Sequence, residues 1–146
     1  MMTISVVKFE PEHLVALELR EHERNHIDKA DMMVYITSMG AQTVTLLDDH
    51  GVVIGITGYW VVWENVLHVY VLPSIHVPKY PISFVRTVKR WLDMLFKGYR
   101  PHRMQTWSLD DKQTNKWMEI LGFHCEGVLQ KFTYDKIDYR MWARIQ

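Results

Sequence analysis

The hydrophobic and polar positions along the chain change their spacing several times, and each change marks a predicted element. Runs of β-branched and apolar residues predict strands, whereas apolar residues three and four positions apart predict helices. The order is β α α β β β α β α β β, over residues 4–8, 11–27, 31–38, 43–47, 52–62, 66–72, 80–99, 104–108, 112–121, 126–134 and 137–145. No repeat, low-complexity tract or linker interrupts this order. The pattern therefore predicts one mixed α/β domain over residues 1–146.

The helix at 80–99 has the clearest pattern, since its apolar residues follow the i, i+3, i+4, i+7 rule from Phe84 onward. The run 66–72 is nearly all apolar, which is typical of a strand buried on both faces. Gly55 and Gly58 interrupt the strand at 52–62 and predict a bulge or a close backbone approach. Asp31 is the predicted cap of the helix at 31–38.

The net charge is zero, with 17 Lys and Arg against 17 Asp and Glu, but the charges are unevenly placed. Residues 1–75 carry 4 basic and 10 acidic groups, residues 76–103 carry 7 basic and 1 acidic, and residues 104–146 carry 6 of each. A neutral total argues against a nucleic-acid or membrane binder. The local excess of positive charge at 76–103 still suits a small phosphate-bearing ligand.

The single cysteine, Cys125, excludes an intrachain disulfide. It lies in a predicted strand, and we expect a buried structural thiol there. The start of the chain lacks the basic and apolar regions of a signal peptide, and no window approaches the apolar length of a membrane span. These features predict a cytoplasmic protein.

Two segments carry a resemblance to the GNAT superfamily of N-acetyltransferases. Residues 71–85, VLPSIHVPKYPISFV, fall without gaps on the family's strand, pyrophosphate loop and helix start. Residues 115–123, NKWMEILGF, are similar to the family's later helix and its exit. The chain looks most like the compact, divergent GNAT-like proteins of tailed phages, which would place it in the host cytoplasm. The resemblance implies a central mixed, mostly antiparallel sheet flanked by about four helices.

The first segment also has a physical interpretation of its own. A strand that runs through a loop into a helix directs backbone N–H groups and the positive end of the helix dipole toward one point, where phosphates bind. The resemblance implies acetyl-CoA as cofactor. The implied cofactor-binding residues are Val71, His76, Val77, Lys79, Tyr80, Ile82, Ser83 and Asn115.

This loop departs from the family pattern Q/R-x-x-G-x-G/A at three positions. His76 replaces the Gln or Arg, Lys79 the first Gly and Pro81 the second. A side chain obstructs the close approach that Gly permits, and Pro removes one N–H donor. Pro81 suits the first position of a helix and leaves the N–H groups of Ile82 and Ser83 available.

The resemblance also implies places for the catalytic groups. The family's carboxylate base on the central strand matches a place near Asn65, with Glu64 adjacent and His68 farther along. Met118 stands where many members have the Tyr that protonates the leaving thiolate, and Tyr80, Tyr134 and Tyr139 are substitutes between which the sequence does not choose. We take Glu64, His68 and Tyr134 as the candidate catalytic residues. No metal is expected.

A competing motif, His22-Glu23-Arg24-Asn25-His26, spells H-E-x-x-H on a predicted helix. Histidines four residues apart share a helix face and bind zinc in metalloproteases, with the Glu as base. No characteristic third ligand follows, and the flanks are charged. The alternatives are a solvated helix face, an acceptor-binding or lid segment, or a zinc hydrolase.

The leading hypothesis is an acetyl-CoA-dependent N-acyltransferase that acts on an amine of a protein or small molecule. The first alternative is a GNAT-fold phage protein that has lost catalysis and acts by binding a partner in assembly or on a host factor. Trp60 and Trp63, at a strand end, are either core residues or walls of an acceptor pocket. Apolar strands at the end of the chain are compatible with a homodimer.

Overall fold

The structure is a computed structural model in which residues 3–25 and 27–146 are described. The strands are β1 (Ser5–Lys8), β2 (Gln42–Leu47), β3 (Val53–Trp63), β4 (Val66–Pro73), β5 (Arg103–Leu109), β6 (His124–Leu129) and β7 (Tyr139–Ile145). The helices are α1 (Pro11–Ala16), α2 (Glu21–Arg24), α3 (Lys29–Ser38), α4 (Pro81–Tyr99) and α5 (Lys112–Ile120), with one 3-10 turn, η1 (Val77–Lys79).

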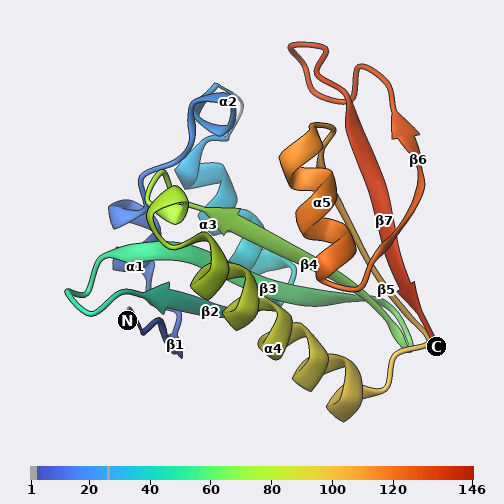
Figure 1. The fold of residues 1–146 in the computed structure, drawn as a ribbon, viewed down its shortest axis with the longest axis horizontal. Helices are drawn as coiled ribbons and strands as arrows, with labels where there is room; N and C mark the ends of the chain where they lie inside the picture. Colours follow the sequence, from blue (N-terminus) through green and yellow to red (C-terminus); the bar gives the residue numbers. More distant parts are fainter. Residues whose placement is uncertain (1–2, 26) are drawn as a thin grey trace. The chain divides into compact units, whose positions relative to one another are not determined.

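The strands form one seven-stranded sheet in the order β1-β2-β3-β4-β5-β7-β6 (Figure 1). The pairs β1–β2, β2–β3, β5–β7 and β6–β7 are antiparallel, and β4–β5 is parallel. The expected α/β class with a mixed, mostly antiparallel sheet is thereby confirmed. Backbone contacts divide the chain into two compact units, Met1–Trp60 with Tyr70–Phe84 and Val61–Val69 with Val85–Gln146. That residues 1–146 make a single domain stays a prediction.

The first unit is built on an apolar core that joins its strands to the segment around α1. The buried members of this core are Leu14, Leu17, Leu19, Val53, Ile56 and Leu72. Gly55 and Gly58 allow close approaches in the same unit, as predicted: a Cβ on Gly55 would lie 2.9 Å from the Phe84 ring, and one on Gly58 would lie 2.6 Å from the Gln42 carbonyl oxygen.

The predicted helix at 11–27 is wrong in its middle part. Residues between α1 and α2 are extended, Leu17 and Leu19 are buried on either side of exposed Glu18, and Leu19 bridges to Ser74. This alternation belongs to a strand-like segment. The Lys29 ammonium donates to the carbonyl oxygens of Val15 and Leu17, at 2.9 and 2.6 Å. It thereby satisfies groups that a continuous helix would have bonded internally.

The start of α3 also differs from the prediction. Asp28 is the cap, because its side chain accepts hydrogen bonds from the N–H groups of Ala30 and Asp31, at 2.8 and 3.2 Å. Asp31, the predicted cap, lies inside the first turn. Gly40, with a φ of 63°, lies just beyond the end of α3, as predicted.

The second unit joins β5, β7 and β6 with α4 and α5. Arg103–Leu109 pairs residue by residue with Tyr139–Ile145 in β7. Asp111 caps α5 by accepting from the Thr114 N–H at 2.7 Å, and Gly122 follows the helix with a φ of 92°. Both features were predicted from the sequence.

The predicted tight hairpin around Asp135-Lys136 is longer than expected. β6 ends at Leu129 and β7 begins at Tyr139, so residues 130–138 form an irregular loop. The Asp138 carboxylate accepts from the Lys131 N–H at 2.8 Å, and the Ile137 carbonyl accepts from the Phe132 N–H at 2.9 Å. These bonds replace the ladder that longer strands would have made.

Cys125 is exposed, so the expected buried thiol is wrong. It lies in β6, which is the last strand of the sheet and whose residues His124–Val128 are all exposed. A strand at the edge of a sheet has a neighbour on one side only, which leaves its side chains more open to solvent. Among the described residues, no helix combines the length and apolarity needed to cross a bilayer.

Candidate functional site

The segment predicted to bind phosphate is formed within the first unit by the end of β4, a turn, η1 and the start of α4. Pro78 lies at the start of η1, and Pro81 is the first residue of α4. Proline suits both places because its fixed φ is helical and its missing N–H is not needed there. The expected strand–loop–helix arrangement is therefore present.

Most backbone N–H groups of this loop are bonded within the protein. Those of Ser74 and Ile75 donate to the carbonyl oxygens of Ile54 and Glu18, at 2.9 and 3.0 Å. The remaining internal bonds run from His76 to the Ser74 hydroxyl and from Val77, Lys79 and Tyr80 to carbonyl oxygens of the loop itself, at 2.9–3.3 Å. The loop therefore presents fewer donors than a glycine-rich phosphate loop does.

The start of α4 is the other part of this segment that suits an anion. Ile82 and Ser83 belong to the first turn of α4. The positive end of the helix dipole lies at this point. The Lys79 side chain is exposed beside it, whereas the His76 imidazole is held by the Glu18 carboxylate at 2.9 Å.

Asn115 in α5 has the clearest unfilled hydrogen-bonding group. Its Nδ2 donates to the Asp110 carboxylate at 3.0 Å, and the same carboxylate oxygen accepts from the Arg140 guanidinium at 2.7 Å. These two bonds, that of Asn115 first, lower the pKa of Asp110. Because Asp110 accepts, the amide orientation is fixed, and the buried Oδ1 of Asn115 has no partner among the described residues. This oxygen fits a ligand that brings an N–H donor, as the amides of coenzyme A do.

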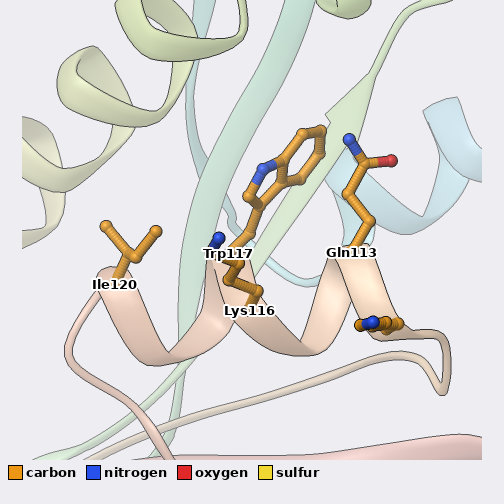
Figure 2. Close-up of a pocket in the computed structure, with 5 residues that line it drawn as sticks. Gln113, Lys116, Trp117 and Ile120 are labelled. Carbon is orange, nitrogen blue, oxygen red and sulfur yellow. The ribbon is translucent and has the colours of Figure 1, made fainter.

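A groove of about 440 Å³ lies along another part of α5, lined by Lys112, Gln113, Lys116, Trp117 and Ile120. Figure 2 shows Gln113, Trp117 and Ile120 rising from the same side of the helix. Asn115 is not among the lining residues, so its orphaned oxygen does not belong to this groove.

His68 is the candidate catalytic residue whose surroundings are most unusual. It lies in β4, paired in register with Gln105 of β5, and its side chain is buried. Its ring packs against Trp107 with centroids 4.3 Å apart. Burial lowers the pKa of His68 to about 4, so its imidazole is neutral at physiological pH.

The other two catalytic candidates are exposed. Glu64 lies in the turn before β4, at the opposite end of that strand from the 74–80 loop. Tyr134 lies in the 130–138 loop and is 76% exposed. The structure connects this loop to His68 through ring contacts of Phe132 and Trp107. The roles of all three residues stay predictions.

The H-E-x-x-H motif lies around α2. Glu23 is buried and forms an ion pair with Arg20 at 2.7 Å, and His22 precedes it in the helix. His26 lies outside the described residues. The zinc interpretation stays a prediction, for which zinc bound to the purified protein and lost in His22→Ala would be the supporting result.

Met118 and the two tryptophans of β3 have different surroundings. Met118 is buried and brings no proton donor to the place of the family's Tyr. Trp60 is buried, with its ring edge-on to Tyr35 at 5.2 Å, and thus belongs to the core. Trp63 is 74% exposed.

Sequence reasoning missed two features of these sites. The pairing of Glu18 with His76 joins residues 58 positions apart, and no local pattern predicts it. The contact of Trp107 with His68 requires the parallel register of β4 and β5. Alternation along 104–108 would have placed Trp107 on one face but not its partner.

The fold that carries these residues is that of the GNAT acetyltransferases. A ribosomal-protein-S5-alanine acetyltransferase from Vibrio fischeri is 18% identical with a TM-score of 0.73, over 97% of this chain and 92% of that one. A GNAT-family acetyltransferase from Bacillus anthracis is 14% identical with a TM-score of 0.70, over 99% and 98%. A GNAT-superfamily phosphinothricin acetyltransferase from Sinorhizobium meliloti, solved with AcCoA, is 16% identical with a TM-score of 0.71, over 98% and 88%. No family model and no curated protein matches the sequence.

Proposed function

We propose that the protein is an acetyl-CoA-dependent N-acyltransferase that acetylates an amine of a protein or small molecule. The observation that carries this proposal is the match of nearly the whole chain to acetyltransferase structures, one of them holding AcCoA. Those structures include one named for a ribosomal protein and one named for phosphinothricin, which supports an amine acceptor of either kind.

The residues present fit acetyl-CoA, although they offer it fewer hydrogen-bond donors than a glycine-rich phosphate loop does. Within the first unit, the Lys79 ammonium and the first turn of α4, with Ile82 and Ser83, would hold phosphate. In the second unit, the Asn115 Oδ1 would accept an amide N–H. Bound acetyl-CoA would supply an acyl thioester. The cofactor would be flanked by Val71 of β4, Val77 of η1 and Tyr80 just after η1. His76 would help to hold this loop in place through its bond to Glu18.

The protein groups proposed for proton movement are His68, Glu64 and Tyr134. Transfer forms a C–N bond, breaks the C–S bond and moves one proton from the amine to the thiolate. The neutral His68 imidazole, three residues before Val71 on β4, would receive the amine proton, with Glu64 as the alternative acceptor. The Tyr134 hydroxyl would donate to the sulfur.

Calorimetric titration with acetyl-CoA tests the proposal. We expect saturable binding that weakens about fivefold to tenfold in Lys79→Ala and in Asn115→Ala, because each loses about one hydrogen bond or charge contact. Lys97→Ala, near the other end of α4, and Gln113→Ala, on the groove side of α5, are the matched controls. No heat and no thermal shift at millimolar acetyl-CoA would overturn the proposal, since a millimolar Kd corresponds to only about 4 kcal/mol.

A second candidate function is a protein of this fold that has lost catalysis and acts by binding a partner. The internally bonded loop amides, Pro81 and the buried Met118 favour it, because each removes a group that the reaction would use. We also propose that the nearest relatives are GNAT-like proteins of tailed phages and that the protein is cytoplasmic. The sequence supports both. A folded protein that shows no binding in the calorimetric titration with acetyl-CoA would favour this second candidate.

A further inference from the structure

A row of aromatic rings in the second unit is not used by the proposed chemistry beyond His68. We call it the aromatic strip, made of His68, Trp107, Phe132 and Tyr139. Neighbouring ring centroids are 4.3 Å apart for His68 and Trp107, 5.5 Å for Trp107 and Phe132, and 5.3 Å for Phe132 and Tyr139. The rings are tilted against one another by 38–59°.

The sheet register explains why Trp107, unlike the buried His68, stays partly open to solvent. Trp107 pairs with Met141 and Leu109 with Tyr139, so these side chains share one face of β5 and β7. Arg144 lies on the other face, where its guanidinium contacts Asp93 of α4 at 2.9 Å and the Leu121 carbonyl after α5 at 3.3 Å. Both helices of this unit therefore contact the face opposite to the strip. Trp107 remains 38% exposed and Phe132 43% exposed.

Phe132 reaches the strip because the 130–138 loop folds back on itself. Its backbone N–H is bonded to the Ile137 carbonyl at 2.9 Å, and the neighbouring Lys131 N–H is bonded to the Asp138 carboxylate at 2.8 Å. The loop is thus held by its own hydrogen bonds, and the Phe132 ring is positioned between Trp107 and Tyr139.

The arginines of β5 and β7 nearest the strip in sequence are paired with carboxylates. Arg103, on the same face of β5 as Trp107, is bonded by both terminal nitrogens to the two carboxylate oxygens of Glu126. Arg140 lies on the other face and is bonded to Asp110 at 2.7 Å. The imidazole of the buried His68 is uncharged at neutral pH. A cation that reaches the face of the partly exposed Trp107 or Phe132 ring is attracted by the ring's quadrupole.

We propose that the aromatic strip binds an ammonium group and selects cationic amines as ligands. Taking that ligand as the acyl acceptor rests on the proposed function. Binding of the ammonium group to the strip does not, because it needs neither cofactor nor transfer.

Binding of choline, compared with its uncharged isostere 3,3-dimethylbutan-1-ol, tests this proposal without acetyl-CoA. Choline has no N–H to acetylate, so a failure of the transferase proposal leaves this test unaffected. We expect saturable choline binding by calorimetry, at least about fivefold tighter than that of the alcohol. Trp107→Leu, which keeps an apolar side chain but removes the ring, should weaken choline about fivefold or more and leave the alcohol nearly unchanged. Trp107→Phe should retain most of the preference.

Two further variants keep the outcome decisive. Phe132→Leu changes a loop residue and should reduce the preference even where Trp107→Leu fails to fold. Trp63→Leu removes an exposed indole elsewhere in the same unit and should change nothing. Equal binding of choline and the alcohol, or loss of choline binding in Trp63→Leu alone, would overturn the proposal. Choline binding without any response to acetyl-CoA would retain the strip as an ammonium site and remove the acceptor role.

Discussion

At the scale of single residues, burial sets the charge state of two side chains. Desolvation raises the pKa of Tyr70 to about 12, against the lowering effect of its hydrogen bond to Thr43, and lowers the pKa of His68 to about 4. Both groups are therefore neutral across the physiological range. For His68 this means that the proposed base begins uncharged, with one ring nitrogen unprotonated.

The same shift predicts how stability depends on pH. An unfolded histidine binds a proton below about pH 6.5, whereas folded His68 resists protonation down to about pH 4. Between these values the unfolded state holds more protons, so the free energy of unfolding falls as the pH falls. We expect a drop from pH 7.5 to pH 5 to destabilise the unmodified protein about 2 kcal/mol more than His68→Gln, measured by urea unfolding.

The control for this experiment is His124→Gln, which changes an exposed histidine of β6 and should keep the pH dependence of the unmodified protein. Parallel pH curves for His68→Gln and the unmodified protein would show that burial of His68 does not shift its pKa.

At the scale of elements, the sequence predicted long helices with many repeats of the apolar pattern correctly, but not the short helices. The apolar repeat of α4 extends over 19 residues, so packing and periodicity agree at many positions. α1 and α2 have 6 and 4 residues, and the burial of Leu17 and Leu19 outweighs the helical pattern between them. The loop at 130–138 depends on bonds from its own side chains, which alternation along the strands does not indicate.

The cap of α3 gives a direct test at this scale. Asp28→Ala should lower the free energy of unfolding by about 1 kcal/mol, because two N–H groups lose their acceptor. Asp31→Ala should cost only about 0.3 kcal/mol, from its charge near the helix start. Urea unfolding of the two variants side by side measures the difference. A larger loss in Asp31→Ala would mean that the helix begins where the sequence pattern predicted.

At the scale of the whole molecule, the sequence predicted the fold class, the implied GNAT fold and the strand–loop–helix arrangement of residues 71–83. Residues 71–83 are contiguous, so a local motif is enough to find them. The aromatic strip is different, because it joins β4, β5, the 130–138 loop and β7. Only the pairing register brings these rings together, and that register is a property of the folded chain.

The balance of charges gives a prediction for the molecule as a whole. The chain has a net charge of zero and an isoelectric point near 7.1, and its acidic and basic residues are grouped in different segments. Low net charge weakens repulsion between molecules, and opposite patches attract. We expect solubility in polyethylene glycol precipitation assays to be lowest near pH 7 and to rise at pH 5.5 and 8.5. A flat profile would contradict this expectation.

The exposed thiol of Cys125 has a practical consequence. It is the only cysteine of the chain, and it lies on the outermost strand of the sheet. β6 leads directly into the 130–138 loop that carries Phe132. A maleimide fluorophore or nitroxide therefore attaches at one defined place without prior mutagenesis, and its signal reports on the neighbourhood of that loop when an amine is added.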